Sequence, residues 1–181
     1  MNKAIFLDRD GTITNSGDHV YKIEDLKFVS GAIEGLKKME ETGYLLIVMT
    51  NQAGIAKNLF SENDYFKFRM EMHRRLNDSE IVIDAEYYCP HHINGVIEKY
   101  KIDCNCRKPK IGMFERAAKD FDLDLSRCWM VGDNPSDILA GKSAGCRTIH
   151  VLTGEEKNPI EYADFEASDL VVASSYILNN L

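Results

Sequence analysis

The chain has 181 residues, of which 44% are apolar and 28% charged, and 29 acidic against 22 basic side chains give a formal net charge of −7. This size and composition fit one globular domain with a buried core and exclude a largely disordered chain. The acidic balance argues against a general binder of nucleic acids or anionic membranes, whose affinity depends on a positive surface. There is no apolar run of about 18 residues and no apolar region of a signal peptide, so we expect a cytoplasmic protein.

Short apolar runs of strand length alternate along the chain with segments of helical period. We predict strands over residues 4–7, 44–49, 81–88, 128–131, 148–152 and 170–173. Helices are predicted after a cap at Ser30, from a capping box at residues 61–64 to about residue 76, over residues 111–121, and from Asn134 with Pro135 at the first helical position. Such alternation builds an α/β/α, Rossmann-like domain around a parallel sheet. Residues 1–181 are therefore expected to form a single domain.

Polar residues follow several of these strands where each one ends. In open parallel sheets the functional site forms at these carboxyl ends. A single aspartate there is usually a turn former or a helix cap, but Asp8, Asp10 and Asp133 could bring three carboxylates together. A hard divalent cation, most simply Mg²⁺, would offset their repulsion. Lys108 adds a positive charge, and Thr50 with the amides around Asn51 adds hydrogen-bond donors, so the set suits a phosphoryl group.

The motif Asp8-Arg9-Asp10-Gly11-Thr12 resembles the first motif of the haloacid dehalogenase superfamily of phosphatases. Thr50-Asn51-Gln52, Lys108 and Gly132-Asp133 resemble its second, third and fourth motifs in the same order, over about residues 4–150. The resemblance implies that Asp8 attacks phosphorus to form an aspartyl-phosphate and that Asp10 serves as general acid and then base. It also implies that Asp8, Asp133 and the backbone carbonyl of Asp10 hold Mg²⁺. Thr50, Asn51, Gln52 and Lys108 would bind the phosphoryl group. Asp137 either supports the metal ligands or favours a helix N-terminus.

Three of the five cysteines lie within residues 89–106, which in a reducing compartment favours a metal over disulfides. The stretch Cys89-Pro90-His91-His92, followed by Cys104-Asn105-Cys106-Arg107-Lys108, resembles the zinc-bearing branch of the superfamily. The resemblance implies a structural Zn²⁺ held by Cys89, His91, Cys104 and Cys106, with His92 as the less favoured substitute. Four protein ligands leave no position open for water. This zinc loop, about residues 89–106, would hold Arg107 and Lys108 at the site.

Members of this branch act on D-glycero-D-manno-heptose 1,7-bisphosphate or on histidinol phosphate. The stretches 8–13, 50–57 and 87–92 favour removal of the heptose 7-phosphate, a step in nucleotide-activated heptose biosynthesis for lipopolysaccharide or surface polysaccharide. Histidinol phosphate is the alternative, ahead of a nucleic-acid 3′-phosphatase and a catalytically silent sugar-phosphate-binding protein. The expected partner is a small sugar phosphate, not nucleic acid or membrane, and the expected state is a monomer.

The length of the connections predicts an open site without a large cap domain. Too few residues separate Ile13 from Ser30 for an inserted domain, and the interval 52–85 is filled by one helix and its connections. Specificity is then expected from the zinc loop and from residues 14–21 and 54–60. Arg107 and His19 are the residues expected to contact substrate from these loops.

Overall fold

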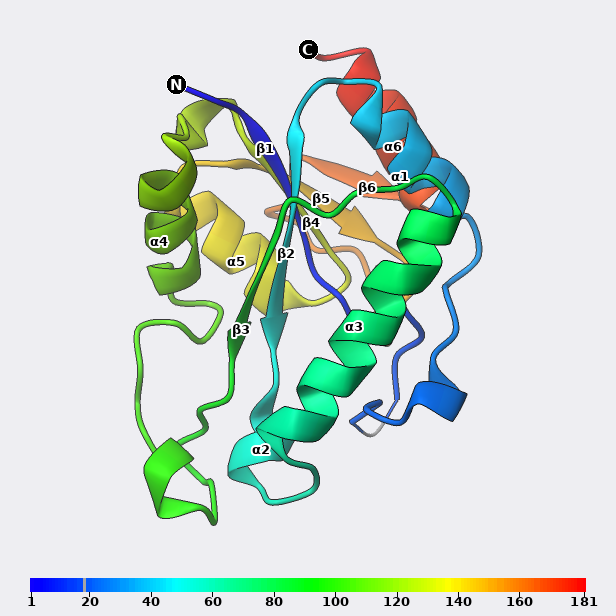
Figure 1. Cartoon of the computed structure of the whole chain (residues 1–181). Helices are drawn as coiled ribbons and strands as arrows, with labels where there is room; N and C mark the ends of the chain where they lie inside the picture. Colours follow the sequence, from blue (N-terminus) through cyan, green and yellow to red (C-terminus); the bar gives the residue numbers. More distant parts are fainter. Residues whose placement is uncertain (18) are drawn as a thin grey trace.

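The computed structural model describes residues 1–17 and 19–181, and its centre is a six-stranded parallel sheet with the strand order β3-β2-β1-β4-β5-β6 (Figure 1). The strands are β1 (Ala4–Leu7), β2 (Leu45–Asn51), β3 (Ala85–Cys89), β4 (Trp129–Gly132), β5 (Arg147–Val151) and β6 (Phe165–Ala167). The order of the strands reverses at β1, which pairs with both β2 and β4. In such sheets ligands bind beyond the carboxyl ends at this reversal, and the predicted fold class is confirmed.

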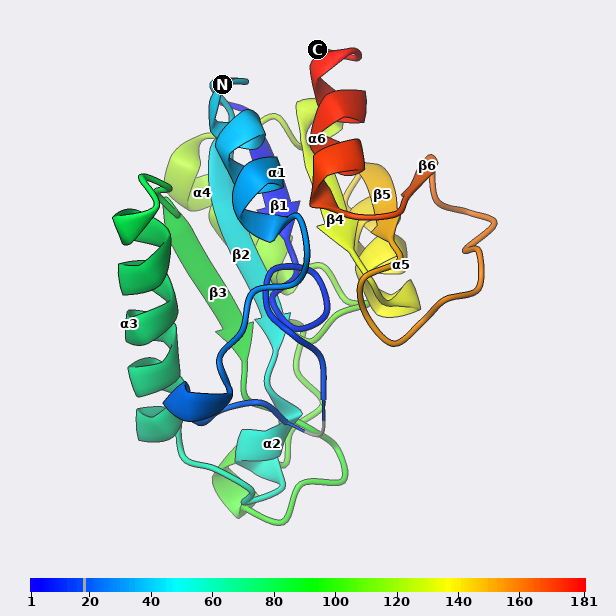
Figure 2. The same ribbon diagram turned by 90° about the vertical axis from the view of Figure 1, so that its right-hand side faces the viewer.

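Helices cover both faces of the sheet (Figure 2). They are α1 (Ala32–Glu40), α2 (Ala53–Ala56), α3 (Glu62–Asp78), α4 (Gly112–Phe121), α5 (Pro135–Ser143) and α6 (Leu170–Leu178). Apolar residues of α1, α3 and α6 share one buried cluster with one face of the sheet, and those of α4 and α5 share a second cluster with the other face. The short α2 follows directly after β2. The protein is thus built from three layers, as its alternating pattern predicts.

Strand β1 shows why the central strands read as unbroken apolar runs. Ile5 and Leu7 point into the cluster under α1, α3 and α6, whereas Ala4 and Phe6 point into the cluster under α4 and α5. All four residues are completely buried, because helices cover both faces of a parallel sheet. The strand ends at Leu7 and therefore delivers Asp8 to the carboxyl edge of the sheet.

Two helix starts follow the capping signals in the sequence. At α3, Ser61 accepts a hydrogen bond from the amide of Asp64, whose carboxylate accepts one from the amide of Ser61 in return. At α5, Asn134 is the cap and Pro135 occupies the first turn. The expected cap at Ser30 is wrong by one position. Gly31, with φ of 77°, precedes the first residue of α1, because a left-handed backbone is open to glycine at little cost.

The strand predicted over residues 170–173 is wrong, because these residues form the first turn of α6. The carboxylate of Asp169 accepts hydrogen bonds from the amides of Val171 and Val172, 2.9 Å each, and this cap outweighs the strand preference of two adjacent valines. The last strand lies earlier, at Phe165–Ala167. The strand predicted from residue 81 begins only at Ala85.

The connections that could hold an inserted domain are short. A loop with one 3₁₀ turn at Ile23–Asp25 joins β1 to α1, and α2 and α3 fill the interval between β2 and β3. Within residues 1–17 and 19–181 we therefore find no cap domain, in agreement with the prediction. None of the helices in the described part of the chain has the length and apolar character that a bilayer crossing requires.

Candidate active site

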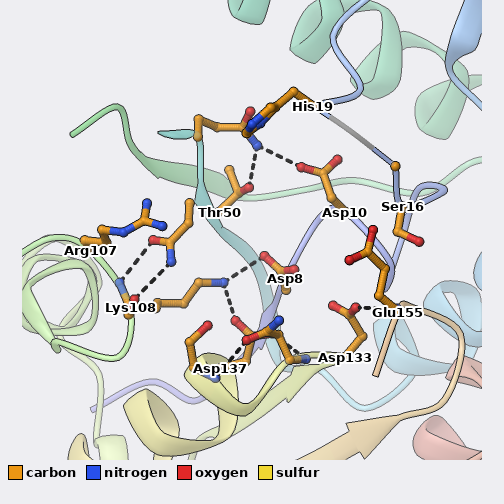
Figure 3. A pocket seen from close by; sticks show the side chains of 15 residues that line it. Asp8, Asp10, Ser16, His19, Thr50, Arg107, Lys108, Asp133, Asp137 and Glu155 are labelled. Atoms are coloured by element: carbon orange, nitrogen blue, oxygen red, sulfur yellow. Dashed lines mark hydrogen bonds and ion pairs between the residues drawn. The ribbon is translucent and has the colours of Figure 1, made fainter. Parts of the chain in front are cut away.

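A cavity of about 420 Å³ opens at the carboxyl edge of the sheet, where β1, β2 and β4 end (Figure 3). Its walls contain all of the predicted catalytic and phosphate-binding residues together with loop residues from several segments. The lining residues include Asp8, Asp10, His19, Thr50, Asn51, Gln52, Arg107, Lys108, Asp133, Asp137 and Glu155. Residues separated by more than 100 positions in the sequence thus face one space.

Lys108 binds two carboxylates at the floor of this cavity. Its Nζ lies 2.7 Å from Oδ1 of Asp8 and 2.7 Å from Oδ1 of Asp137, and it also donates to the carbonyl of Met49. Burial opposes the charge on this side chain, but Asp137 and Asp8 outweigh burial and raise the pKa of Lys108. The ammonium group is therefore a fixed positive charge beside Asp8.

Three buried aspartates meet behind this lysine. One carboxylate oxygen from each of Asp8, Asp133 and Asp137 lies within 4.8 Å of the other two. Burial and then the charge of Asp137 raise the pKa of Asp8 well above its ordinary range, and the same two causes raise the pKa of Asp133 to about 6. Like charges held this close favour a cation among them.

The predicted cluster of carboxylates needs one correction. The side chain of Asp10 does not join Asp8 and Asp133, and Asp137 stands in its place. Asp137 lies in the first turn of α5, four residues after Asp133, so both face the same edge of the sheet. This spacing is the signal in the sequence that could have given Asp137 a larger role.

The surroundings of Asp133 fit a small, hard cation. Its Oδ1 atom is buried and has no hydrogen-bond partner among the described residues, while Oδ2 accepts a 3.3 Å bond from the amide of Glu155. A Cβ atom on Gly11 or Gly154 would come within 2.4 Å or 1.7 Å of Oδ2. Two loops therefore pass directly against the carboxylate. An all-oxygen donor set of this kind suits Mg²⁺.

The carboxylate of Asp10 is held by groups on the other side of the cavity. Arg9 donates from Nε and Nη2 to its two oxygens at 2.9 and 2.7 Å. Gln52 donates to Oδ2 at 2.9 Å. The hydroxyl of Thr14 lies 3.3 Å from both Oδ1 of Asp10 and the carbonyl of Arg9, and its single proton serves one of them at a time. Figure 3 shows Asp10 separated from Asp8, on the side of Thr50 and His19. Asp8 and Asp10 thus have different partners although only one residue lies between them.

The end of β2 positions the loop that carries Lys108. The side-chain amide of Asn51 donates to the carbonyl of Lys108 and accepts from its backbone amide, both at 3.0 Å. Gln52 donates to the hydroxyl of Thr50 at 2.8 Å. The side chains of Asn51 and Gln52 are therefore engaged with the protein itself, and their contact with a phosphoryl group stays a prediction, as does that of Thr50.

The four predicted zinc ligands converge outside the cavity. The Sγ atoms of Cys89, Cys104 and Cys106 lie 3.0–3.4 Å apart, and Nδ1 of His91 lies 3.3 Å from Sγ of Cys106. These separations exceed the ~2.05 Å of a disulfide bond, and all three thiols are free. Contact with Cys89 lowers the pKa of Cys106 to about 5, so one thiolate is available. His92 stands outside the cluster and accepts from the amide of Asn94.

Two expected substrate contacts lie on the rim of the cavity. Arg107 follows the cysteine cluster, and its Nη1 donates to the carbonyl of His91 at 3.5 Å. His19 lines the cavity, with its ring centroid 6.4 Å from that of Phe60. Asp18, in the expected specificity loop 14–21, lies outside the described residues. Both rim residues have the position that a contact with a bound ligand requires, and the contact itself stays a prediction.

Comparison with known proteins agrees with this geometry. Residues 105–178 match a family model described as HAD-hydrolase-like. A D-glycero-beta-D-manno-heptose-1,7-bisphosphate 7-phosphatase from Pasteurella multocida is 45% identical over 86% of this chain and 84% of its own length. An enzyme named for the alpha form of the same substrate, from Photorhabdus laumondii, is 41% identical over 84% of each chain.

A solved structure gives the same result. It is the D,D-heptose 1,7-bisphosphate phosphatase from B. bronchiseptica complexed with magnesium and phosphate, with a TM-score of 0.87, 29% identity and full coverage of both chains. The agreement thus extends from the sequence motifs to the whole fold. This chain belongs to the haloacid dehalogenase-like family that contains the D-glycero-D-manno-heptose-1,7-bisphosphate 7-phosphatases.

Proposed function

We propose that this protein is a Mg²⁺-dependent phosphomonoesterase that removes the 7-phosphate of D-glycero-D-manno-heptose 1,7-bisphosphate. The observation that carries the proposal is the pairing of Asp8 with Lys108 at 2.7 Å on the floor of a cavity, backed by Asp133 and Asp137. A carboxylate nucleophile beside a fixed cation is the arrangement that phosphoryl transfer through an enzyme-bound intermediate needs. The names of the relatives supply the heptose bisphosphate.

In the first half-reaction a carboxylate oxygen of Asp8 attacks phosphorus, and the bond between phosphorus and the C7 oxygen of the sugar breaks. Asp10 gives a proton to the departing oxygen, which leaves as a hydroxyl group. In the second half-reaction water attacks the phosphorus of the aspartyl-phosphate and gives its proton to Asp10. Inorganic phosphate leaves and Asp8 is restored. Lys108 balances charge on Asp8 and on the transferred oxygens, with Thr50, Asn51 and Gln52 at the same phosphoryl group.

The metal ligands in this proposal are Asp8, Asp133 and the backbone carbonyl of Asp10. Their support is the buried, unpartnered oxygen of Asp133 and the all-oxygen donor set around it. When bound, Mg²⁺ supplies positive charge to the phosphoryl oxygens. Asp137 has a supporting role, because it holds Lys108 in place together with Asp8.

The cysteine cluster in this proposal holds one structural Zn²⁺ through Cys89, His91, Cys104 and Cys106. Three sulfurs and one imidazole nitrogen are a donor set that zinc binds in tetrahedral geometry. The loop from residue 89 to 106 ends directly before Arg107, which we assign to the second phosphate of the substrate together with His19. A guanidinium group suits phosphate because its donors form a fork. We also propose that the protein is a cytoplasmic monomer that acts on a small molecule, and its net charge of −7 argues against a nucleic-acid or anionic-membrane partner.

The test is a substrate panel measured with the wild type and two matched variants. Asp8→Asn keeps the shape of the nucleophile and removes its charge, so turnover should fall at least about 10³-fold, a barrier increase of about 4 kcal/mol. Asp122→Asn makes the same chemical change at an exposed site and should have no effect. The panel contains both anomers of the heptose bisphosphate, histidinol phosphate and a 3′-phosphorylated oligonucleotide. Faster release of phosphate from histidinol phosphate would reassign the substrate, and near-normal turnover by Asp8→Asn would remove the nucleophile assignment.

A further inference from the structure

We infer that Arg9 is a positioning residue for the acid–base group Asp10, fixing the plane of its carboxylate from inside the protein. The inference rests on the proposed function, in which Asp10 exchanges a proton at two steps. Arg9 stands between the two aspartates of the first motif, and the reaction described above assigns it no part. Its side chain is nevertheless buried and bound to the carboxylate of Asp10.

The contact between Arg9 and Asp10 is forked. Nε of Arg9 lies 2.9 Å from Oδ1 of Asp10, and Nη2 lies 2.7 Å from Oδ2. Two parallel hydrogen bonds from a planar guanidinium fix both the position and the plane of a carboxylate. Nη2 donates in addition to the carbonyl of Val20 at 3.1 Å. Arg9 is only 1% exposed, so its donors are shielded from solvent.

The position of Arg9 is fixed in turn by a buried network beneath it. Its guanidinium carbon lies 4.7 Å from the ring centroid of Phe68 and 5.7 Å from that of Tyr65. The hydroxyl of Tyr65 donates to Glu86 at 2.5 Å, and the Glu86 side chain is completely buried. Arg9 therefore lies close to two aromatic rings of α3 and within electrostatic reach of two carboxylates, Asp10 and Glu86. A charge held in this way cannot swing into the cavity without losing all of these partners.

The donors around Asp10 show what this arrangement does. Oδ2 accepts from both Arg9 and Gln52, whereas Oδ1 accepts from Arg9 and shares the single hydroxyl proton of Thr14 with the carbonyl of Arg9. A carboxylate oxygen has about two lone-pair sites, and both are filled at Oδ2, so proton exchange at this oxygen requires one donor to give way. Gln52 is neutral and lines the cavity, so a ligand can displace it, whereas Arg9 is charged and does not line the cavity. The proton is then exchanged at Oδ2, on the side of Gln52, while Arg9 keeps the carboxylate aimed at the cavity.

The test varies the leaving group, because a general acid matters most when the leaving group is poor. Arg9→Lys keeps the charge and removes the fork. Values of kcat/KM are measured for the heptose bisphosphate and for a series of substituted phenyl phosphates of increasing leaving-group acidity. We expect a loss of about 30-fold or more on the sugar phosphate and less than about threefold on 4-nitrophenyl phosphate. Arg75→Lys changes a partly buried arginine of α3 in the same way and should leave the series unchanged.

A double-mutant cycle gives the second readout. If Arg9 acts through Asp10, Arg9→Lys should cause no further loss in protein that already carries Asp10→Asn. Phe68→Leu removes one ring beside the guanidinium. It should lower kcat/KM less than Arg9→Lys does, with the same dependence on the leaving group. This variant replaces Arg9→Lys if Arg9→Lys does not fold.

The outcomes separate the inference from the proposed function. Equal losses across the series, or losses that multiply in the double variant, would overturn the positioning role alone. If the loss of kcat/KM in Asp10→Asn did not depend on the leaving group, the acid–base assignment of Asp10 would fail, and the role of Arg9 would fail with it.

Discussion

Replacing Asp133 by asparagine should stabilise the metal-free protein at neutral pH and remove most of the stabilisation that Mg²⁺ provides. Burial and the charge of Asp137 raise the pKa of Asp133 from 3.8 to about 6. A carboxyl group with a raised pKa in the folded state favours folding while it is protonated. This contribution is complete below about pH 3.8 and is lost as the pH rises through about 6. At pH 7.5 the folded state therefore carries a cost of about 3 kcal/mol, and at pH 4.5 a cost of about 1 kcal/mol.

The measurement is urea unfolding followed by the fluorescence of Trp129, the single tryptophan, which is completely buried in β4. In Mg²⁺-free buffer, Asp133→Asn should raise the free energy of unfolding by about 2–3 kcal/mol at pH 7.5 and by about 1 kcal/mol or less at pH 4.5. Mg²⁺ at 100 times its dissociation constant should stabilise the wild type by about 2.7 kcal/mol at pH 7.5. The variant, which lacks a ligand charge, should gain far less.

The same experiment can refute this reasoning. Equal stability changes at the two pH values would mean that the ionisation of Asp133 is not the source of the cost. If Mg²⁺ raised the free energy of unfolding equally in the wild type and in Asp133→Asn, Asp133 would not be a ligand. Asp122→Asn, at an exposed position, is the matched control and should alter neither quantity by more than about 0.5 kcal/mol.

Three further predictions concern the zinc loop, the substrate and the helical layer. Cys106→Ser should lower the zinc content from one per chain and reduce the Tm, because zinc binding is coupled to folding; zinc-free wild type with titratable disulfides would contradict the site. Arg107→Ala should lower kcat/KM for the heptose bisphosphate by a factor that corresponds to about 1.5–3 kcal/mol, as for a charged hydrogen bond, with a smaller effect on an aryl phosphate. Equal losses on the two substrates would indicate that Arg107 contacts the reacting phosphate instead. Gly35→Ala should destabilise the protein by about 1–3 kcal/mol through overpacking, because its Cβ would lie 2.5 Å from the backbone of Leu170 in α6; an unchanged urea midpoint would contradict this contact.

The fold was predictable where burial alone decides it. Strands covered on both faces must be apolar throughout, and residues 4–7 and 128–131 show this plainly. The prediction failed at residues 170–173, where an apolar, β-branched run begins a helix because Asp169 caps it. A side-chain hydrogen bond of this kind depends on the approach of the chain and cannot be seen in the hydrophobic pattern.

The site was predictable as far as its motifs place residues at strand ends. Their positions after predicted strands indicated that Asp8, Lys108 and Asp133 belong to one site, and in the structure all three line one cavity. The sequence did not distinguish the partners of Asp10 from those of Asp8, because these depend on side-chain direction. The larger roles of Asp137 and Arg9 were missed for the same reason: a charge beside a motif shows its function only when its partners are known.

Removal of zinc should affect binding of the second phosphate more than catalysis at the reacting phosphate. Lys108 and Arg107 are adjacent in sequence, but different parts of the protein hold them. Lys108 has contacts independent of the cysteine cluster, since Asn51 binds its backbone on both sides and Asp8 and Asp137 bind its Nζ. The hydrogen bond of Arg107 runs to the carbonyl of His91, inside the cluster. Loss of zinc should therefore displace Arg107 first. Cys106→Ser should raise the KM for the heptose bisphosphate about tenfold or more while the kcat for an aryl phosphate changes less than about threefold. A parallel fall in both would mean that the zinc loop positions Lys108 as well, and that the contacts of Asn51 are not sufficient to hold it.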